Sequence, residues 1–137
     1  MIKFKKNLFL FCAGGLGYNL LEIVWRGSSH WTMFLVGGSC FRVIGSIRRH
    51  FPKMRLIPQC ALCSASITLI EFLSGCLINK KLGLQVWDYS HLPLNIFGQV
   101  CLPFSLLWGG VSILALKADT LLCRFLDIPP IEHRHSI

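Results

Sequence analysis

The chain has 137 residues, of which 53% are apolar and only 15% charged, and its mean hydropathy is +0.58. Typical soluble domains carry about 25% charged residues, so this composition excludes a soluble enzyme, a disordered protein and a disulfide-stapled secreted domain. Fourteen basic and six acidic side chains give a formal net charge of +8. We expect residues 1–137 to form a single membrane domain, an all-α bundle of four transmembrane helices plus a short C-terminal amphipathic helix.

The first two predicted spans cover residues 8–24 and 31–47. The first lacks a small-residue cleavage site, so we expect an uncleaved helix rather than a signal peptide. The second is short and contains Arg42, five residues before its end. A long side chain at that position can reach the membrane interface, so we expect Arg42 to have a structural or topological role, with ligand binding as the alternative.

The third and fourth predicted spans cover residues 56–78 and 96–116. The fourth belongs to a run from Leu92 to Leu116 without any charged residue. An uncharged run of this length exceeds what a buried helix of a soluble protein needs. Within this run, Pro103 predicts either a kink in the helix or a backbone carbonyl at Gln99 that lacks its helical hydrogen bond.

The last part of the chain differs in pattern. Residues 118–128 carry apolar side chains at helical spacing, which predicts a short amphipathic helix on the inner membrane surface: Ala118, Leu121, Leu122, Phe125 and Leu126. Asp119, Cys123 and Asp127 fall on its other side. We expect a mobile tail over residues 129–137, where His133 and His135 would make a poor metal cage.

Basic residues flank the predicted spans. With the N-terminus inside, ten fall on the inner side: Lys3, Lys5, Lys6, Arg48, Arg49, Lys53, Arg55, Lys117, Arg124 and Arg134. Only Arg26, Lys80 and Lys81 fall outside. The positive-inside rule then predicts a multi-pass protein of the bacterial inner membrane with both termini in the cytoplasm. Because this placement accounts for the charge, we expect the lipid bilayer and not nucleic acid as the partner.

No motif indicates catalysis. The sequence contains no phosphate-binding loop, nucleophile elbow or H-E-x-x-H zinc motif, so we expect no enzyme activity, no catalytic residue, no metal and no cofactor. Most of the seven cysteines lie in apolar runs and are expected to pack as small apolar residues. Cys60 and Cys63 form a C-x-x-C pair within a predicted span, which leaves redox or metal chemistry as an alternative.

Small residues recur where helices can approach closely. Such residues allow close backbone contact and interhelical hydrogen bonds in membranes. We expect seven of them to lie at helix contacts: Gly14, Gly37, Gly38, Ser64, Gly75, Ser105 and Gly109.

Ionisable side chains are predicted to converge in the outer half of the bundle. Arg26 follows Glu22 by four residues, the spacing of a helical ion pair, and Glu71 lies in the outer half of the third span. Four loop residues complete the candidate substrate-binding set: His30, Asp88, His91 and Asn95. Two interpretations stay open. The set forms a substrate, cation or proton site, or Glu22 pairs with Arg26 while neighbouring Ser, Thr or Tyr groups bind Glu71.

Two longer stretches, residues 17–45 and 71–110, carry more specific motifs. In order these are a late Glu22, R-G-x-S-H-W from Arg26, the pair Gly37 and Gly38, E-x-x-x-G from Glu71, W-D-Y-S from Trp87, P-L-N-I-x-G from Pro93 and S-L-L-W-G from Ser105. Together they resemble the bacterial membrane family called putative ABC-transporter permease, type IV.

The resemblance implies a permease or another transport-related role. Because four short helices are few for a complete transport path, we also expect a homo-oligomer or a larger membrane complex, with a separate ATPase subunit as one option. The alternative is a non-transporting subunit or regulator that binds another membrane protein. An intramembrane enzyme is a third and less supported option.

Overall fold

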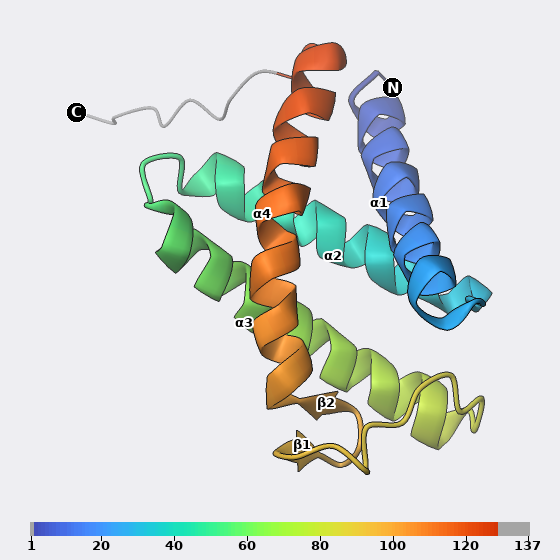
Figure 1. Ribbon diagram of the computed structural model, residues 1–137. Coiled ribbons are helices and arrows are strands. Elements are labelled where there is room, and N and C mark those ends of the chain that lie inside the picture. Colours follow the sequence, from blue (N-terminus) through green and yellow to red (C-terminus); the bar gives the residue numbers. More distant parts are fainter. Residues whose placement is uncertain (1, 129–137) are drawn as a thin grey trace.

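Four helices make up most of the described chain, which comprises residues 2–128 of this computed structural model (Figure 1). The elements in chain order are α1 (Ile2–Arg26), α2 (Trp31–His50), α3 (Leu56–Gly75), η1 (Cys76–Lys81), β1 (Asn95–Ile96), β2 (Val100–Cys101) and α4 (Leu102–Phe125). The π-helical segment η1 continues α3, and β1 pairs antiparallel with β2. The predicted tail, residues 129–137 with its two histidines, lies outside the described residues.

Three helices are long and apolar enough to cross a membrane. They are Lys3–Arg26, Leu56–Lys81 and Leu102–Phe125. The predicted second span, residues 31–47, forms a helix but is not among the candidate spans found in residues 2–128. This helix, α2, carries three arginines and packs against α1, α3 and α4. Because the other helices shield much of its surface from lipid, α2 does not need the apolar surface of an isolated span.

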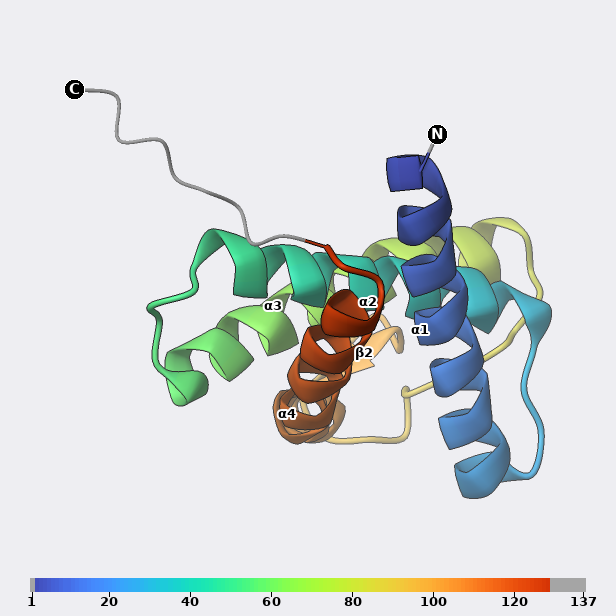
Figure 2. The same cartoon turned by 90° about the horizontal axis from the view of Figure 1, so that it is seen from above.

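The helices do not run parallel. α2 lies alongside α3, α4 crosses both of them steeply, and α1 packs mainly on α2 (Figures 1 and 2). The beginning of α1 and the end of α4 meet, since Lys6 Nζ donates to the backbone carbonyl of Asp127 at 3.3 Å. At the far end of α1, Arg26 contacts the long connection between α3 and α4. The molecule therefore has two distinct ends, one near both described chain ends and one near that connection.

The start of α4 differs from the prediction. The helix begins at Leu102 rather than at residue 96, because residues 95–101 form the small β-hairpin. Pro103 lies in the first turn, where its missing N–H has no helical partner to lose, so the expected kink is wrong. The carbonyl of Gln99 accepts a hydrogen bond from Trp87 Nε1 at 3.0 Å.

The end of α4 also corrects the sequence analysis. α4 continues unbroken to Phe125, so the described residues contain no separate amphipathic helix over 118–128. Leu121 and Phe125 face outward and are 64% and 79% exposed, whereas Asp119 and Cys123 face the other helices and are buried. Ala118, Leu122 and Leu126 are half-buried and pack against the cluster around Cys123. A helix surrounded by lipid turns its apolar side outward and its polar side toward protein, which is the reverse of a surface-bound helix.

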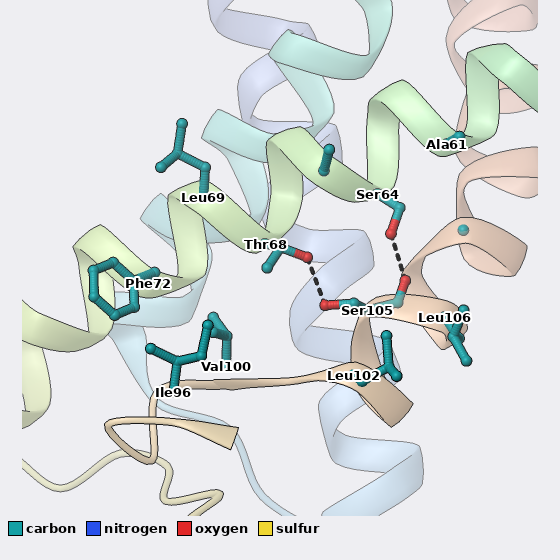
Figure 3. Close-up of a pocket in the computed structure, with 12 residues that line it drawn as sticks. Ala61, Ser64, Thr68, Leu69, Phe72, Ile96, Val100, Leu102, Ser105 and Leu106 are labelled. Atoms are coloured by element: carbon teal, nitrogen blue, oxygen red, sulfur yellow. Dashed lines mark hydrogen bonds between the residues drawn. The ribbon is translucent and has the colours of Figure 1, made fainter. Parts of the chain in front are cut away.

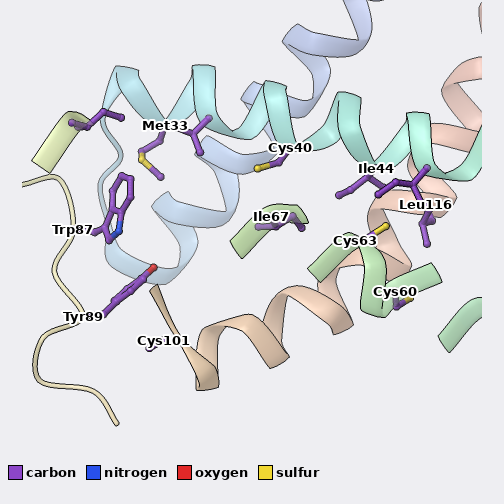
Figure 4. Packing of buried hydrophobic residues seen from close by; sticks show 13 residues of the cluster. Met33, Cys40, Ile44, Cys60, Cys63, Ile67, Trp87, Tyr89, Cys101 and Leu116 are labelled. Carbon is purple, nitrogen blue, oxygen red and sulfur yellow. The ribbon is translucent and has the colours of Figure 1, made fainter. Parts of the chain in front are cut away.

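The core lies largely between α2 and α3 (Figure 4). Met33, Cys40 and Ile44 from α2 belong to the same buried cluster as Cys63 and Ile67 from α3. Trp87, Tyr89 and Cys101 extend this cluster into the connection before α4. Five of the seven cysteines are buried and all seven are unpaired: Cys12, Cys40, Cys60, Cys63, Cys76, Cys101 and Cys123. Small thiol side chains thus fill part of the interhelical space.

Candidate functional site

A pocket of about 220 Å³ lies between α1, α4 and the connection that precedes α4. Five aromatic side chains line it: Tyr18, Trp25, Tyr89, Phe104 and Trp108. Glu22 and Arg26 also line it, with Arg26 Nη1 3.9 Å from Glu22 Oε2. Arg26 Nη1 additionally donates to the carbonyl of Val86 at 3.4 Å. We call this space the aromatic pocket. It combines aromatic rings with one carboxylate and one guanidinium.

Glu71 is held by two residues that line the aromatic pocket. Tyr89 Oη donates to Oε1 at 3.3 Å, and Trp108 Nε1 donates to Oε2 at 3.1 Å. Burial raises the pKa of the Tyr89 hydroxyl well above its ordinary value, so this group remains a hydrogen-bond donor. Glu71 itself is only 2% exposed. Both carboxylate oxygens are therefore bound, and they join α3 to α4 and to the connection.

The other four predicted site residues lie elsewhere. His30 caps α2, because its Nδ1 accepts from the Thr32 backbone N–H at 3.3 Å. Asp88 is exposed and accepts from the Ser90 N–H at 2.9 Å, which lowers the pKa of Asp88. His91 is exposed near Asp88, and Asn95 binds the Leu92 carbonyl at 2.8 Å. The structure thus brings together Glu22, Arg26 and Glu71, while the other four lie outside the aromatic pocket.

Two amide side chains that the sequence did not single out, those of Asn79 and Gln99, hold the connection in place. Asn79 Oδ1 accepts from the Val86 N–H at 2.8 Å, and Asn79 Nδ2 donates to Gln99 Oε1 at 2.7 Å. Gln99 is buried, and its carbonyl binds Trp87. Polar amides within apolar stretches, such as Gln99, were the available signal, because they need buried partners. These bonds fix the loop that carries Tyr89 to the aromatic pocket.

A second polar cluster, also missed, lies near the end of α4. Asp119 Oδ2 accepts from Arg48 Nε at 2.8 Å and from Arg49 Nη1 at 3.3 Å. The Asp119 side chain is only 1% exposed, and a Cβ added at Gly45 would meet its Oδ1. The adjacent arginines at the end of α2 were the available signal, because such a pair calls for an acidic partner. One buried carboxylate thus joins α2 to α4.

Three of the predicted packing glycines lie between α1 and α2. A Cβ added at Gly14 would collide with Phe41, and one at Gly37 would collide with Tyr18. A Cβ at Gly38 would lie 2.8 Å from the backbone oxygen of Phe11. The two helices therefore approach one another too closely for side chains at these positions.

The remaining packing residues lie along α3 and α4. Ser64 Oγ donates to the Ser105 carbonyl, and Thr68 Oγ1 lies 2.7 Å from Ser105 Oγ (Figure 3). Gly109 adjoins Ser64, and Gly75 adjoins Gln99 and Trp87. The three hydroxyl residues and Gly109 also line an open groove of about 670 Å³ whose other walls are mostly apolar.

Replacing Glu71 with glutamine should weaken the link between α3 and α4. A glutamine side chain offers one acceptor oxygen where two donors need one each, and its amide NH₂ would face a donor. A buried donor left without an acceptor should lower the free energy of unfolding by about 1–2 kcal/mol. The midpoint of unfolding in detergent measures this, with Glu22→Gln as the partly exposed control. Equal midpoints for the two variants would contradict the expectation.

Comparison with known proteins adds one finding. A family model described as "Putative ABC-transporter type IV" matches residues 9–132. No curated protein and no solved structure matches the chain. The matched range includes the aromatic pocket, Glu71 and the Asp119 cluster.

Proposed function

We propose a transport function, because this chain belongs to the family described as "Putative ABC-transporter type IV". In this proposal the chain is the membrane component of a transport system, and the aromatic pocket receives the substrate. No catalytic step is assigned to the chain. The observation that carries the proposal is the aromatic pocket itself, with Glu22 at its wall and Glu71 held behind it.

The chemistry of the aromatic pocket favours a small organic cation. Aromatic faces attract cations through their quadrupoles. This region contains two carboxylates, those of Glu22 and Glu71, and one guanidinium, that of Arg26. The volume of about 220 Å³ is below the range typical of drug-sized ligands, so the ligand would be small.

Transport would require further subunits. Three candidate spans and one central helix are few for a complete path across a bilayer. We propose a second copy of the chain or another membrane subunit beside it, and a separate ATPase as the energy source. The open groove between α3 and α4 supports such an assembly, because small residues such as Ala61, Ala65 and Gly109 permit close helix contact.

We propose the bacterial inner membrane as the location, with both termini in the cytoplasm. The contact between Lys6 and Asp127 supports termini at one common end. Arg48 and Arg49 pair with Asp119 of α4, in the half of α4 that approaches this end. Trp25 and Trp31, both exposed, lie near the other end, and such rings favour the membrane interface. The aromatic pocket would then open toward the outer side.

A second candidate function is a non-transporting subunit or regulator. The saturation of Glu71 favours it, since both carboxylate oxygens are bound and the side chain is nearly inaccessible. A structural role for Glu71 needs no substrate, whereas transport needs a pocket that water can reach.

Thiol labelling separates the two functions. Val111→Cys introduces a thiol into the aromatic pocket, and Leu114→Cys introduces one on the exposed apolar side of α4. We expect a membrane-impermeant maleimide added outside intact cells to label Val111→Cys above the wild-type background but not Leu114→Cys. Tetramethylammonium should slow that labelling. No labelling of Val111→Cys from either side of the membrane would reject the transport function in favour of the regulator.

A further inference from the structure

We propose that a second pocket, next to Arg42 of α2, binds a phosphate-type anion. This pocket has a volume of about 470 Å³ and is lined by Arg42, Val43, Ser46, Ile47, His50 and Phe51. We call it the Arg42 pocket. It is separate from the aromatic pocket, and the proposal does not depend on the transport function.

The hydrogen bonding of Arg42 is incomplete. Its Nη2 donates to Asn7 Oδ1 at 3.0 Å, which ties α2 to α1. Its Nη1 is buried and has no hydrogen-bond partner among the described residues. A buried charged donor without a partner is costly, and a guanidinium presents paired donors that match the oxygens of a phosphate group. Arg42 lines the pocket, and because Nη1 itself is closed off from solvent, an anion there supplies the missing acceptor once the guanidinium turns toward it.

The charges around the Arg42 pocket also favour an anion. Three guanidinium groups, those of Arg42, Arg48 and Arg49, lie in this part of the molecule with one carboxylate, that of Asp119. Arg48 and Arg49 both bind that carboxylate, so within residues 2–128 Arg42 has no acidic side chain paired with it alone. His50 adds a ring whose Nδ1 lies 2.8 Å from the Ser46 carbonyl. The local balance is an excess of positive charge.

The rest of the lining is apolar and suits a lipid headgroup with its attached chains. Val43, Ile47 and Phe51 line the pocket beside the polar Arg42 and Ser46. All the lining residues belong to α2 or to Phe51 directly after it, so the pocket is open on its other sides, and basic sites on membrane helices attract anionic headgroups. A free phosphate ion would satisfy the same donor, so the test must distinguish the two sources.

Native mass spectrometry of the full chain in detergent tests the proposal. The protein is mixed with equal amounts of phosphatidylglycerol and phosphatidylcholine that carry identical acyl chains. We expect wild type to retain phosphatidylglycerol preferentially, and Arg42→Gln to reduce that preference about tenfold, as loss of a charged hydrogen bond implies. Lys53→Gln removes the same charge from an exposed position in the α2–α3 loop and should keep the preference.

Two further variants keep the test decisive if Arg42→Gln fails to fold. Ser46→Leu fills the pocket without changing charge and should also reduce the preference, while Arg42→Lys should retain part of it. If excess inorganic phosphate removes the wild-type preference for phosphatidylglycerol, the anion is a soluble phosphate. If the preference survives, the anion is the lipid headgroup.

The proposal is overturned if Ser46→Leu and Arg42→Gln retain lipid like wild type. It is equally overturned if wild type neither prefers phosphatidylglycerol nor is stabilised by phosphate.

Discussion

Replacing Asp119 with asparagine is expected to lower the free energy of unfolding by about 3–5 kcal/mol. Asp119 is buried and is the carboxylate that both Arg48 and Arg49 contact, at 2.8 and 3.3 Å. Asparagine keeps the shape but removes the charge, which leaves two guanidinium groups in a partly buried region without a counter-charge. Loss of helicity with increasing SDS in mixed micelles, followed by circular dichroism, measures the change.

A matched control lies in the same part of the chain. Asp127 is exposed and its contact with Lys6 uses the backbone carbonyl, so Asp127→Asn should leave the unfolding midpoint nearly unchanged. Replacing the cluster as a whole, with Arg48→Leu, Arg49→Met and Asp119→Leu together, should recover much of the stability, because the cluster then contains no unpaired charge. If Asp119→Asn unfolds at the same SDS fraction as Asp127→Asn, the cluster does not stabilise the fold.

Replacing Gly15 with valine should cost about 3 kcal/mol, the upper part of the range for overpacked positions. A Cβ at Gly15 would lie 2.6 Å from the backbone oxygen of Phe34 and 2.7 Å from its ring. A backbone atom cannot rotate away as a side chain can, so α1 and α2 must move apart. Because α1 packs mainly on α2, this separation would weaken the attachment of the whole helix. The same SDS titration measures the loss.

Gly17 provides the control, two residues further along α1. A Cβ there meets nothing within 4 Å, so Gly17→Val should be tolerated. Gly17→Ala should stabilise the protein by about 0.5–1 kcal/mol, since alanine restricts the unfolded chain more than glycine does. Equal midpoints for Gly15→Val and Gly17→Val would show that α1 and α2 do not pack as closely as described.

The membrane character of the fold follows from the sequence, but the boundaries of its helices do not follow fully. Long apolar runs with few charges predict α1, α3 and α4, because a helix exposed to lipid needs an apolar surface. Hydropathy identified the uncharged run that ends at Leu116, yet it could not show that residues 95–101 form a hairpin. It also could not show which face of residues 118–125 lies outward, because that depends on whether the helix crosses the membrane or lies on it.

The candidate site also follows only in part from the sequence. The pair of Glu22 and Arg26 follows from helical spacing alone. The partners of Glu71 do not, because Tyr89 and Trp108 lie 18 and 37 residues away and reach it only through tertiary packing. Asp119 was assigned to the polar face of a surface helix, and its arginine partners lie about 70 residues earlier in the chain. Local patterns identify pairs within one helix, whereas pairs between helices need the packing.

The separation between Arg48 and Asp119 also constrains the order in which the protein matures. Asp119 is synthesised 71 residues after Arg48, an interval of roughly 4–14 s at ordinary rates of translation. During this interval α2 carries its arginines without their counter-charge. The early hairpin of α1 and α2 can therefore form, but the end of α2 reaches its final environment only when α4 has been made and inserted. The end of α2 is thus expected to be the last part of the early hairpin to reach its final environment.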